Sequence, residues 1–418
     1  MEDTNVFPSV PEYLKHELNE IAKKHHFLEY NIHVDKGCNH GDGFMATMIA
    51  VTVKGQQCHN GVTVNRELPL ICKILPVCES RRKAFSADTV FEREAYFYNT
   101  ISPIFVQLLK EKNISVDEEF TIHPKCFAAI YEPDTDRCLI IMENLKSIGF
   151  DLWNKRVPHD FETVGMVLSE LGKFHAVSFA IRDQKKEIFD KMFTVTEPFL
   201  KMFRGNGAAE TMVSGSIQQT IDVLDDVQEI KVMQMVKDNY QTWIREYLKS
   251  DAAGRFSVLN HGDLWNNNLM FKLENQNRQL RLVDFQLLRL TSPVMDISYF
   301  LSTSTNPTVL QRFDDLLQIY YNSLATFLTK LGSDPQKLFT FDDLEDQFRQ
   351  FGDYGLIFAS ILIGVMVSDA EDIIDMDLVK DDTKANGLAT LNDDTKMLLK
   401  ERISSVIQLA IKAGWVKI

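Results

Sequence analysis

Long hydrophobic segments are missing from the sequence. The longest apolar run, Gly355–Val367, contains two glycines and a serine, and it is shorter than the roughly 20 residues that a membrane-spanning helix needs. We therefore predict a buried core helix there and no membrane span. The first residues, Met1–Leu18, carry acidic side chains and prolines where a secretion signal needs a basic flank and an apolar core. A cytoplasmic location is the expectation.

A surplus of positive charge is also missing. The 418 residues carry a formal net charge of -14 at pH 7. Nucleic acids and anionic membranes are bound by basic surfaces, so neither is expected to be the main partner. An anionic cofactor would need a local cation or a metal ion beside it.

Cysteines are few and irregularly spaced. All six lie in the first third of the chain, and no two form a Cys-x-x-Cys pair. In a chain of this length the pattern favours reduced thiols over disulfides or a zinc site. The six residues are Cys38, Cys58, Cys72, Cys78, Cys126 and Cys138.

The first third of the chain predicts a small β-sheet with helices beside it. An amphipathic helix is expected over about residues 10–27, and a longer helix over about residues 87–111 with a kink at Pro103. The buried stripe of the first helix is expected at Leu14, Leu18 and Ile21. Strands are expected on both sides of a glycine turn within residues 35–55 and over residues 68–75, 125–132 and 138–145.

Beyond Asn144 most of the sequence has helical spacing. A β-hairpin over residues 268–274 and 279–285 interrupts the helices. The chain is too long for one small core, so we predict an α+β fold with two lobes. Residues 1–143 form the lobe with the sheet, and residues 144–418 form a larger helical lobe.

The segment VLNHGDLWNNNLMF, Val258–Phe271, has the residues needed for phosphoryl transfer. This reaction needs Mg²⁺ ions to neutralise the phosphates of ATP and a carboxylate that orients the attacking hydroxyl and accepts its proton. Asp263 is the candidate base. Asn268, five positions later, and Asp284, at the end of the hairpin, are candidate Mg²⁺ ligands because this ion prefers hard oxygen donors. Trp265 either lines the substrate side of the loop or holds it in place.

Lys73 lies in the middle of an apolar strand, in ICKIL. A lysine in this position buries its aliphatic stem and directs its ammonium group into a cleft, where it would contact the α- and β-phosphates. An ordinary edge-strand lysine is the alternative. Its carboxylate partner should come from the next helix, which offers Glu92 and Glu94.

The motif HGDLWNNNLMF followed by LVDFQ resembles the catalytic loop and metal-binding segment of the kinase-like phosphotransferases, which include aminoglycoside and choline kinases. More narrowly, His-Gly-Asp-x-Trp-x-x-Asn with its flanking residues resembles the ecdysteroid kinase-like family. The resemblance implies a bilobal protein kinase-like fold with ATP and Mg²⁺ as cofactors. The family's Phe-x-x-Glu pattern matches Phe91 and Glu94, which makes Glu94 the implied partner of Lys73.

The resemblance also implies where the nucleotide binds. The segment LIIMENL is similar to the connector between the lobes that binds adenine through backbone groups, which puts Glu143 and Leu145 near the base. Gly41 and Gly43 would let a loop close over the phosphates, although GCNHGDG lacks the regular glycine spacing of protein kinases. Alternatively, LIIMENL is only the end of a strand and does not bind adenine.

The acceptor is expected to be a small hydroxyl compound and not a protein. Asp296 follows Asp284 by only twelve positions, which leaves little room for the activation segment that holds a peptide in protein kinases. Gln286 also replaces the glycine of the protein-kinase DFG motif. By the resemblance, Asp296 caps or braces its own helix and does not bind metal.

The resemblance to ecdysteroid kinases implies a steroid alcohol as the acceptor. The Phe- and Met-rich segment Phe189–Phe203 would suit such an apolar molecule as a lid, or it simply packs into the core. Choline, ethanolamine or another amino alcohol would need an acidic and aromatic cage, which the acidic stretch Asp369–Asp382 offers. Hydroxylated foreign compounds are a further possibility.

A binding protein without catalysis, for nucleotides or sterols, is the alternative of another class. The presence of Lys73, Asp263, Asn268 and Asp284 speaks against it. The sequence leaves the oligomeric state open.

Overall fold

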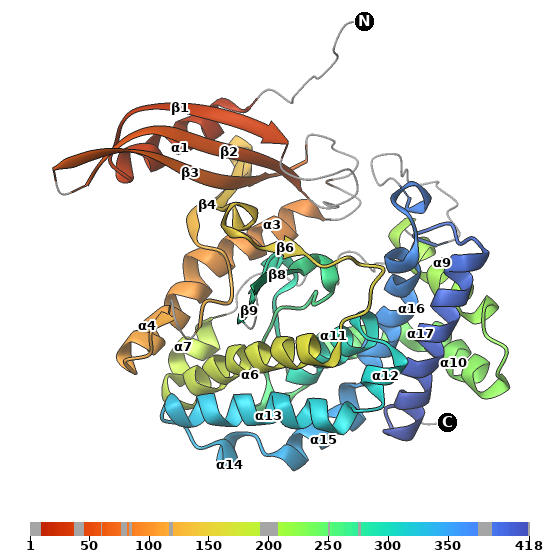
Figure 1. The fold of residues 1–418 in the computed structure, drawn as a ribbon. Coiled ribbons are helices and arrows are strands. Elements are labelled where there is room, and N and C mark those ends of the chain that lie inside the picture. Colours follow the sequence, from red (N-terminus) through yellow and green to blue (C-terminus); the bar gives the residue numbers. More distant parts are fainter. Residues whose placement is uncertain are drawn as a thin grey trace, which may run out of the picture.

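The structure is a computed structural model that describes most of the chain. It covers residues 10–36, 46–59, 61–76, 82, 86–116, 120–192, 208–249, 251–274, 277–374 and 387–416. The fold is α+β, as the sequence predicts. A small antiparallel sheet forms the N-terminal part, and the C-terminal part is mostly helical (Figure 1).

Three sequence predictions fall wholly or partly outside the described residues. Gly41 and Gly43 lie in the gap at residues 37–45. The expected Phe- and Met-rich lid lies largely in the gap at 193–207, and much of the acidic stretch lies in the gap at 375–386. These interpretations stay predictions.

The N-terminal sheet has five strands in the order β1-β2-β3-β5-β4, and every neighbouring pair is antiparallel. The expected strands are all present, and those around the glycine turn are longer than predicted. The strands are β1 (Phe27–Lys36), β2 (Thr47–His59), β3 (Val62–Ile74), β4 (Cys126–Glu132) and β5 (Arg137–Glu143).

Alternation along the strands divides the sheet into two buried faces. Leu139 and Ile141 of β5 pack with helix α1 (Glu12–Lys24), whose Leu14, Leu18 and Ile21 are buried as predicted. Cys138, Ile140 and Met142 of the same strand point the other way, into the main core that includes apolar residues of helix α3 (Ala87–Tyr96). The side-chain period of two in a strand accounts for this division, and it leaves Lys73 of β3 on the face opposite Cys72.

The helix expected over residues 87–111 is present but interrupted. It consists of α3 (Ala87–Tyr96), a π-helical turn (Phe97–Ile101) and α4 (Ser102–Glu111). Pro103 stands in the first turn of α4. Because proline has no N–H to donate to the preceding turn, the regular hydrogen-bond ladder is broken there, and the irregularity appears as the π-helical turn.

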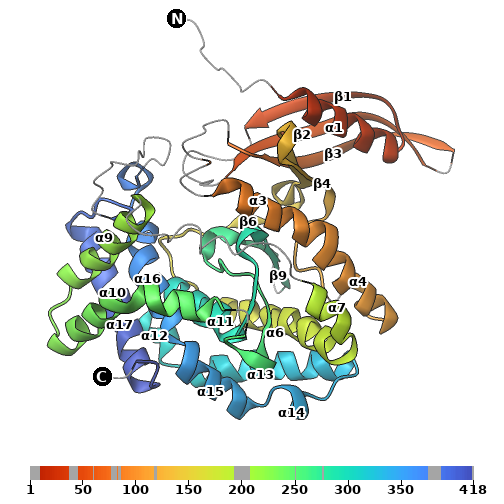
Figure 2. The ribbon, with the colours of Figure 1, turned by 180° about the vertical axis from the view of Figure 1, so that it is seen from behind.

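The C-terminal part is built from helices around one core. The helices are α6 (Phe161–Gln184), α7 (Lys186–Lys191), α9 (Ala208–Asp222), α10 (Val227–Tyr247), α11 (Pro293–Ser304), α12 (Pro307–Leu310), α13 (Phe313–Lys330), α14 (Pro335–Leu338), α15 (Phe341–Phe351), α16 (Asp353–Val367) and α17 (Asp393–Lys412). Helices α6 and α13 lie side by side in both views (Figures 1 and 2). Gly172 permits this close approach, since a Cβ there would lie 2.8 Å from the carbonyl oxygen of Tyr320.

The apolar run of the sequence is helix α16, which is buried against α11, as predicted. By length and composition alone, α6 would be able to cross a membrane, as would the pair Pro335–Phe351 and Asp353–Val367, which is bent by 54°. In α6, 78% of the apolar window is buried inside the protein.

Two further small sheets are formed by strands that follow the N-terminal sheet in the chain. The expected hairpin is formed by β8 (Leu269–Glu274) and β9 (Asn277–Leu282), and β6 (Asp151–Leu152) joins it. A separate ribbon pairs β7 (Val258–Asn260) with β10 (Arg289–Thr291). The sequence did not predict β6, β7 or β10. The two sheets position the ends of the segments that carry the candidate site.

Candidate active site

The HGD loop runs from the end of β7 to the start of β8, and a carboxylate of α11 holds its backbone. The backbone N–H groups of His261 and Gly262 donate to Asp296 Oδ2 and Oδ1 at 2.7 and 2.9 Å. His175 Nε2 of α6 lies 3.5 Å from the same carboxylate. Burial opposes the charge of Asp296, but His175, His261 and the Gly262 N–H outweigh it and hold its pKa below the ordinary value. Asp296 is therefore a buried carboxylate that fixes the loop.

This position corrects the sequence interpretation of Asp296 as a cap or brace of its own helix. Ser292 caps α11, since its hydroxyl accepts the N–H of Val294 at 3.3 Å. Asp296 lies one turn further along and faces the loop. The two N–H groups of the loop have no partner within a helix or strand, and a buried donor needs an acceptor, which explains the orientation of Asp296.

Gly262 has a conformation that a side chain would disturb. Its φ is +85°, and a Cβ would lie 2.0 Å from the carbonyl oxygen of Leu287. We expect Gly262→Ala to lower the free energy of unfolding by about 1–2 kcal/mol for the left-handed backbone and by about 1–3 kcal/mol more for the clash.

The matched control for Gly262→Ala is Gly414→Ala. Gly414 has φ +71° and no atom within 4 Å of an added Cβ, so it carries the backbone strain alone. Chemical denaturation of both variants measures the difference. Equal losses of stability in the two variants would contradict the role given to the close approach at Leu287.

Asp263 receives a hydrogen bond on each carboxylate oxygen. Tyr299 of α11 donates its hydroxyl to Oδ1 at 2.8 Å, and Asn268 donates Nδ2 to Oδ2 at 2.9 Å. Asn268 Nδ2 also lies 2.8 Å from the carbonyl oxygen of Asp263. Burial raises the pKa of Asp263 above its ordinary value, and Tyr299 and Asn268 oppose that rise. Because a carboxylate has about four acceptor positions, each oxygen keeps one for a further donor.

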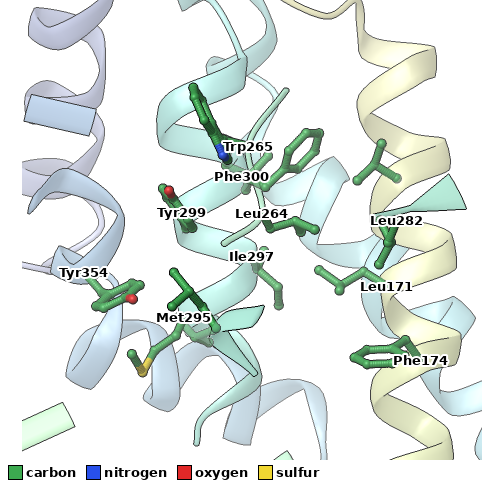
Figure 3. Close-up of a cluster of buried hydrophobic side chains, with 14 of the residues drawn as sticks. Leu171, Phe174, Leu264, Trp265, Leu282, Met295, Ile297, Tyr299, Phe300 and Tyr354 are labelled. Atoms are coloured by element: carbon green, nitrogen blue, oxygen red, sulfur yellow. The ribbon is translucent and has the colours of Figure 1, made fainter. Parts of the chain in front are cut away.

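The packing beneath the loop explains why Asp263 is held in one place. Figure 3 shows Leu264 and Trp265 beside Ile297, Tyr299 and Phe300 of α11. Trp265 is only 7% exposed, which favours the interpretation that it holds the loop in place. Tyr299 also contacts Phe358 of α16, with ring centroids 4.6 Å apart.

Asp284 follows β9 in a left-handed conformation, with φ 70°. The segment is joined to the HGD loop by two bonds to the backbone of Val283: its N–H donates to the Asn268 carbonyl at 3.0 Å, and His261 Nε2 lies 2.9 Å from its carbonyl oxygen. Gln286, in place of the DFG glycine, donates Nε2 to Asp284 Oδ2 at 2.9 Å. The hairpin thus brings Asn268 and Asp284 to the same side of the site.

Lys73 of β3 forms ion pairs with both Glu94 of α3 and Asp284. Burial disfavours the charged ammonium, but the two carboxylates outweigh it, so the pKa of Lys73 lies above its ordinary value. Burial raises the pKa of Glu94 above its ordinary value, and the ion pair with Lys73 opposes that rise without cancelling it. The pair is Lys73 with Glu94, as the Phe-x-x-Glu pattern implies. Glu92 is partly exposed and does not belong to this pair.

Helix α3 and the π-helical turn that follows it have further contacts with the Asp284 segment. The rings of Phe97 and Phe285 are stacked, with centroids 3.8 Å apart and planes at 7°. Arg93 is buried and donates Nη1 to the carbonyl oxygen of Leu288. The helix that carries Glu94 is therefore fixed directly to the segment that carries Asp284.

Glu143 and Leu145 stand where the chain leaves the N-terminal sheet. The Glu143 N–H donates to Lys125 O at 2.9 Å, and the Lys125 N–H donates to Glu143 Oε1 at 2.7 Å. Leu145 is buried and forms a small apolar cluster with Phe150 and with Met270 of β8. The connector is thus backed by an apolar surface, the kind of surface on which a flat ring packs.

The residues near Asp263 contain donors suited to Mg²⁺. Within the described residues, no group of three or more His, Cys, Asp or Glu side chains could hold a metal by itself. Mg²⁺ does not require such a group, because it keeps several waters and takes one or two carboxylates together with phosphate oxygens. Asp284 supplies a carboxylate. The amide of Asn268 points its Nδ2 toward Asp263, so its Oδ1 is the atom left to bind the metal. Asp284 and Asn268 therefore fit a Mg²⁺ ion that is bound together with a nucleotide.

Two residues that the sequence analysis did not select contact the candidate base or its loop. Tyr299 donates a hydrogen bond to Asp263. His159 lies just before α6, and its Nε2 is 2.9 Å from Asn266 Oδ1. Neither residue belongs to a recognisable motif. The only signal for Tyr299 is its helical spacing from Asp296, three positions earlier on α11.

Comparison with solved structures gives similar chains at low sequence identity. An ethanolamine kinase from Plasmodium vivax is 12% identical, with 99% of this chain and 93% of that chain covered and a TM-score of 0.41. A microcompartment-associated aminopropanol kinase is 10% identical, with 96% and 98% covered and a TM-score of 0.43. The GDP complex of wild-type aminoglycoside 2'-phosphotransferase-IIIa is 16% identical, with 82% and 96% covered and a TM-score of 0.38.

No curated protein matches the chain significantly. The model of the ecdysteroid kinase-like family matches residues 40–333. This range includes Lys73, Glu94 and the whole HGD loop through Asp284. The chain belongs to the ecdysteroid kinase-like family.

Proposed function

We propose that this protein transfers the γ-phosphate of ATP to a hydroxyl group of a small apolar alcohol. The observation that carries the proposal is the meeting of the Lys73–Glu94 pair, Asp263 and Asp284 at one place, with Asn268 bonded to Asp263. Phosphoryl transfer is catalysed mainly by positioning and by charge stabilisation. These five side chains can supply both.

Asp263 acts as the base. It orients the acceptor hydroxyl and takes its proton on a carboxylate oxygen, while Tyr299 and Asn268 keep the carboxylate from rotating. Burial raises the pKa of Asp263, which strengthens it as a base as long as it stays ionised. Asp263 therefore has the geometry and the basicity for this role.

Lys73, Asn268 and Asp284 hold the nucleotide and its metal. Lys73 contacts the α- and β-phosphates, and Glu94 keeps its ammonium in position. Asn268 and Asp284 bind Mg²⁺ through their side-chain oxygens. When bound, Mg²⁺ neutralises charge on the phosphates. The backbone of Glu143 and Leu145 meets the adenine ring in our proposal, and the loop with Gly41 and Gly43 covers the phosphates.

The acceptor that we propose is an ecdysteroid. Membership of the ecdysteroid kinase-like family supports this choice. ADP release by the purified protein with Mg²⁺ and ATP tests it, over a panel of ecdysteroids, choline, ethanolamine and hydroxylated foreign compounds. Turnover with an ecdysteroid alone is the expected result. Turnover with an amino alcohol alone would overturn the acceptor and keep the reaction.

Tyr299→Phe is expected to reduce turnover and to move its pH dependence. The hydroxyl of Tyr299 lowers the pKa of Asp263, so its removal raises that pKa. A base works deprotonated, and turnover falls as the pH falls through its pKa. The acid limb of the variant's pH profile should therefore lie at higher pH than that of the wild type. Turnover should fall about 10-fold or more, since a hydrogen bond to a charged group contributes about 1.5–3 kcal/mol.

The pH profile of kcat measures this effect, and Tyr321→Phe is the control. Tyr321 of α13 also loses a hydrogen bond in the variant, from Gln336 at 3.3 Å, but it does not contact Asp263. An acid limb that stays in place in Tyr299→Phe would contradict the coupling of Tyr299 to the base.

A further inference from the structure

One buried side-chain pair joins the HGD loop to the chain segment that leads into α6. His159 Nε2 lies 2.9 Å from Asn266 Oδ1, and both residues are 0% exposed. Because the acceptor is an amide oxygen, Nε2 of His159 must carry the proton and donate it. The pair has no role in the proton or phosphate transfer described above.

Asn266 begins the turn that presents Asn268. Residues Asn266–Asn268 form a single 3₁₀ turn after Trp265. The Asn268 N–H donates to the Trp265 carbonyl at 2.9 Å, and the side chain of Asn268 bonds Asp263. A short turn of this kind has few internal hydrogen bonds, so its geometry depends on side-chain contacts at its ends. Asp263 holds the last residue, and His159 holds the first.

His159 is itself held by a backbone hydrogen bond and by three aromatic rings. Its backbone N–H donates to Ser304 O at 3.0 Å, at the C-terminal end of α11. Its ring lies 4.6 Å from Trp153, 5.3 Å from Phe271 and 5.9 Å from Phe300 between centroids. A ring packed in this way keeps one orientation, and α11 is also the helix that carries Asp296 and Tyr299. The bond to Asn266 is therefore part of the same rigid frame as the other contacts of the loop.

We infer that His159 is a positioning residue that sets the orientation of Asn268 through Asn266, and thereby the affinity of the site for Mg²⁺ in the presence of ATP. The inference rests on the proposed function. Loss of an outer residue that orients a metal ligand typically changes metal affinity by about 10–100-fold. The effect should appear in binding, before any acceptor is present.

The experiment is a calorimetric titration of ATP at a series of Mg²⁺ concentrations, with the wild type and variants of the full chain. His159→Phe keeps a flat ring and removes the donor. His159→Gln keeps a donor near the position of Nε2. Trp153→Phe disturbs the packing around the ring and leaves the bond to Asn266, so it is the control for a merely structural role.

We expect the half-saturating Mg²⁺ concentration to rise about 10–100-fold in His159→Phe, to return most of the way to the wild-type value in His159→Gln, and to stay unchanged in Trp153→Phe. In an Asn266→Ala background, His159→Phe should add no further change, because the bond is already absent. Thermal melting of each variant tests whether the fold is kept.

Two results would overturn the inference alone: a wild-type Mg²⁺ requirement in His159→Phe, or an equal rise in Trp153→Phe. Mg²⁺-independent ATP binding, or none, by the wild-type protein would instead overturn the proposed function and this inference with it. The titration therefore separates the two failures, and it does so without knowledge of the acceptor.

Discussion

Asp263→Asn is expected to reduce kcat by about 10²–10⁴-fold, the usual contribution of a general base, with MgATP affinity nearly unchanged. An asparagine is the same size and can keep both neighbours. Its amide oxygen can accept from Asn268 Nδ2, and its amide nitrogen can donate to the oxygen of Tyr299, which accepts as well as donates. The variant therefore loses the base and keeps the shape of the loop.

Steady-state kinetics and calorimetric titration of MgATP together measure this prediction. Asp251→Asn, at an exposed position, is the matched control and should behave as the wild type. Equal turnover of Asp263→Asn and the wild type would contradict the assignment of Asp263 as the base. Loss of MgATP binding together with turnover would show that Asp263 holds the metal and is not a base alone.

Asp284→Ala is expected to abolish the Mg²⁺ dependence of nucleotide binding. Loss of even an outer partner of a metal site lowers metal affinity by about 10–100-fold, so the loss of a direct carboxylate ligand should lower it by at least that factor. Lys73 keeps Glu94 as its partner in this variant, so the ammonium stays in place. Weak ATP binding without Mg²⁺ should therefore remain.

Titration of ATP with and without Mg²⁺ measures this effect, and Asp263→Asn is the natural comparison. The two acidic residues lie in one site, yet only one is expected to be needed for Mg²⁺-dependent binding. Tight binding of MgATP by Asp284→Ala would contradict the metal site. A melting temperature far below that of the wild type would assign the loss to folding, and Asp284→Asn would then separate the two explanations because it retains an oxygen donor.

The sheet and the main helices could be predicted because their signals are local. Alternation along β2, where Ile49, Val51 and Val53 are buried, and the helical spacing of α1 follow directly from which side chains are buried. The Asp263-to-Asn268 interval and Asp284 at the hairpin end are likewise readable, since one short loop and one strand pair fix their positions. The boundary between residues 143 and 144 remains a prediction.

The contacts that hold the loop could not be predicted in the same way. Asp296 and Tyr299 lie on α11, where all twelve residues are buried, so burial does not single them out. Strands β7 and β10 have three residues each, which is too short for alternation to appear. His159 lies 104 positions before Asp263 in the chain, and only the tertiary fold reveals its contact with Asn266.

The most direct test of the central claim follows the γ-phosphate itself. ATP labelled in that phosphate is incubated with the purified protein, Mg²⁺ and an ecdysteroid, and the label in the steroid is compared with the ADP formed. We predict one labelled steroid phosphate for each ADP, and neither product with Asp263→Asn in the same time. Label found only in inorganic phosphate, or ADP formation that does not depend on any alcohol, would contradict a kinase acting on a small hydroxyl compound.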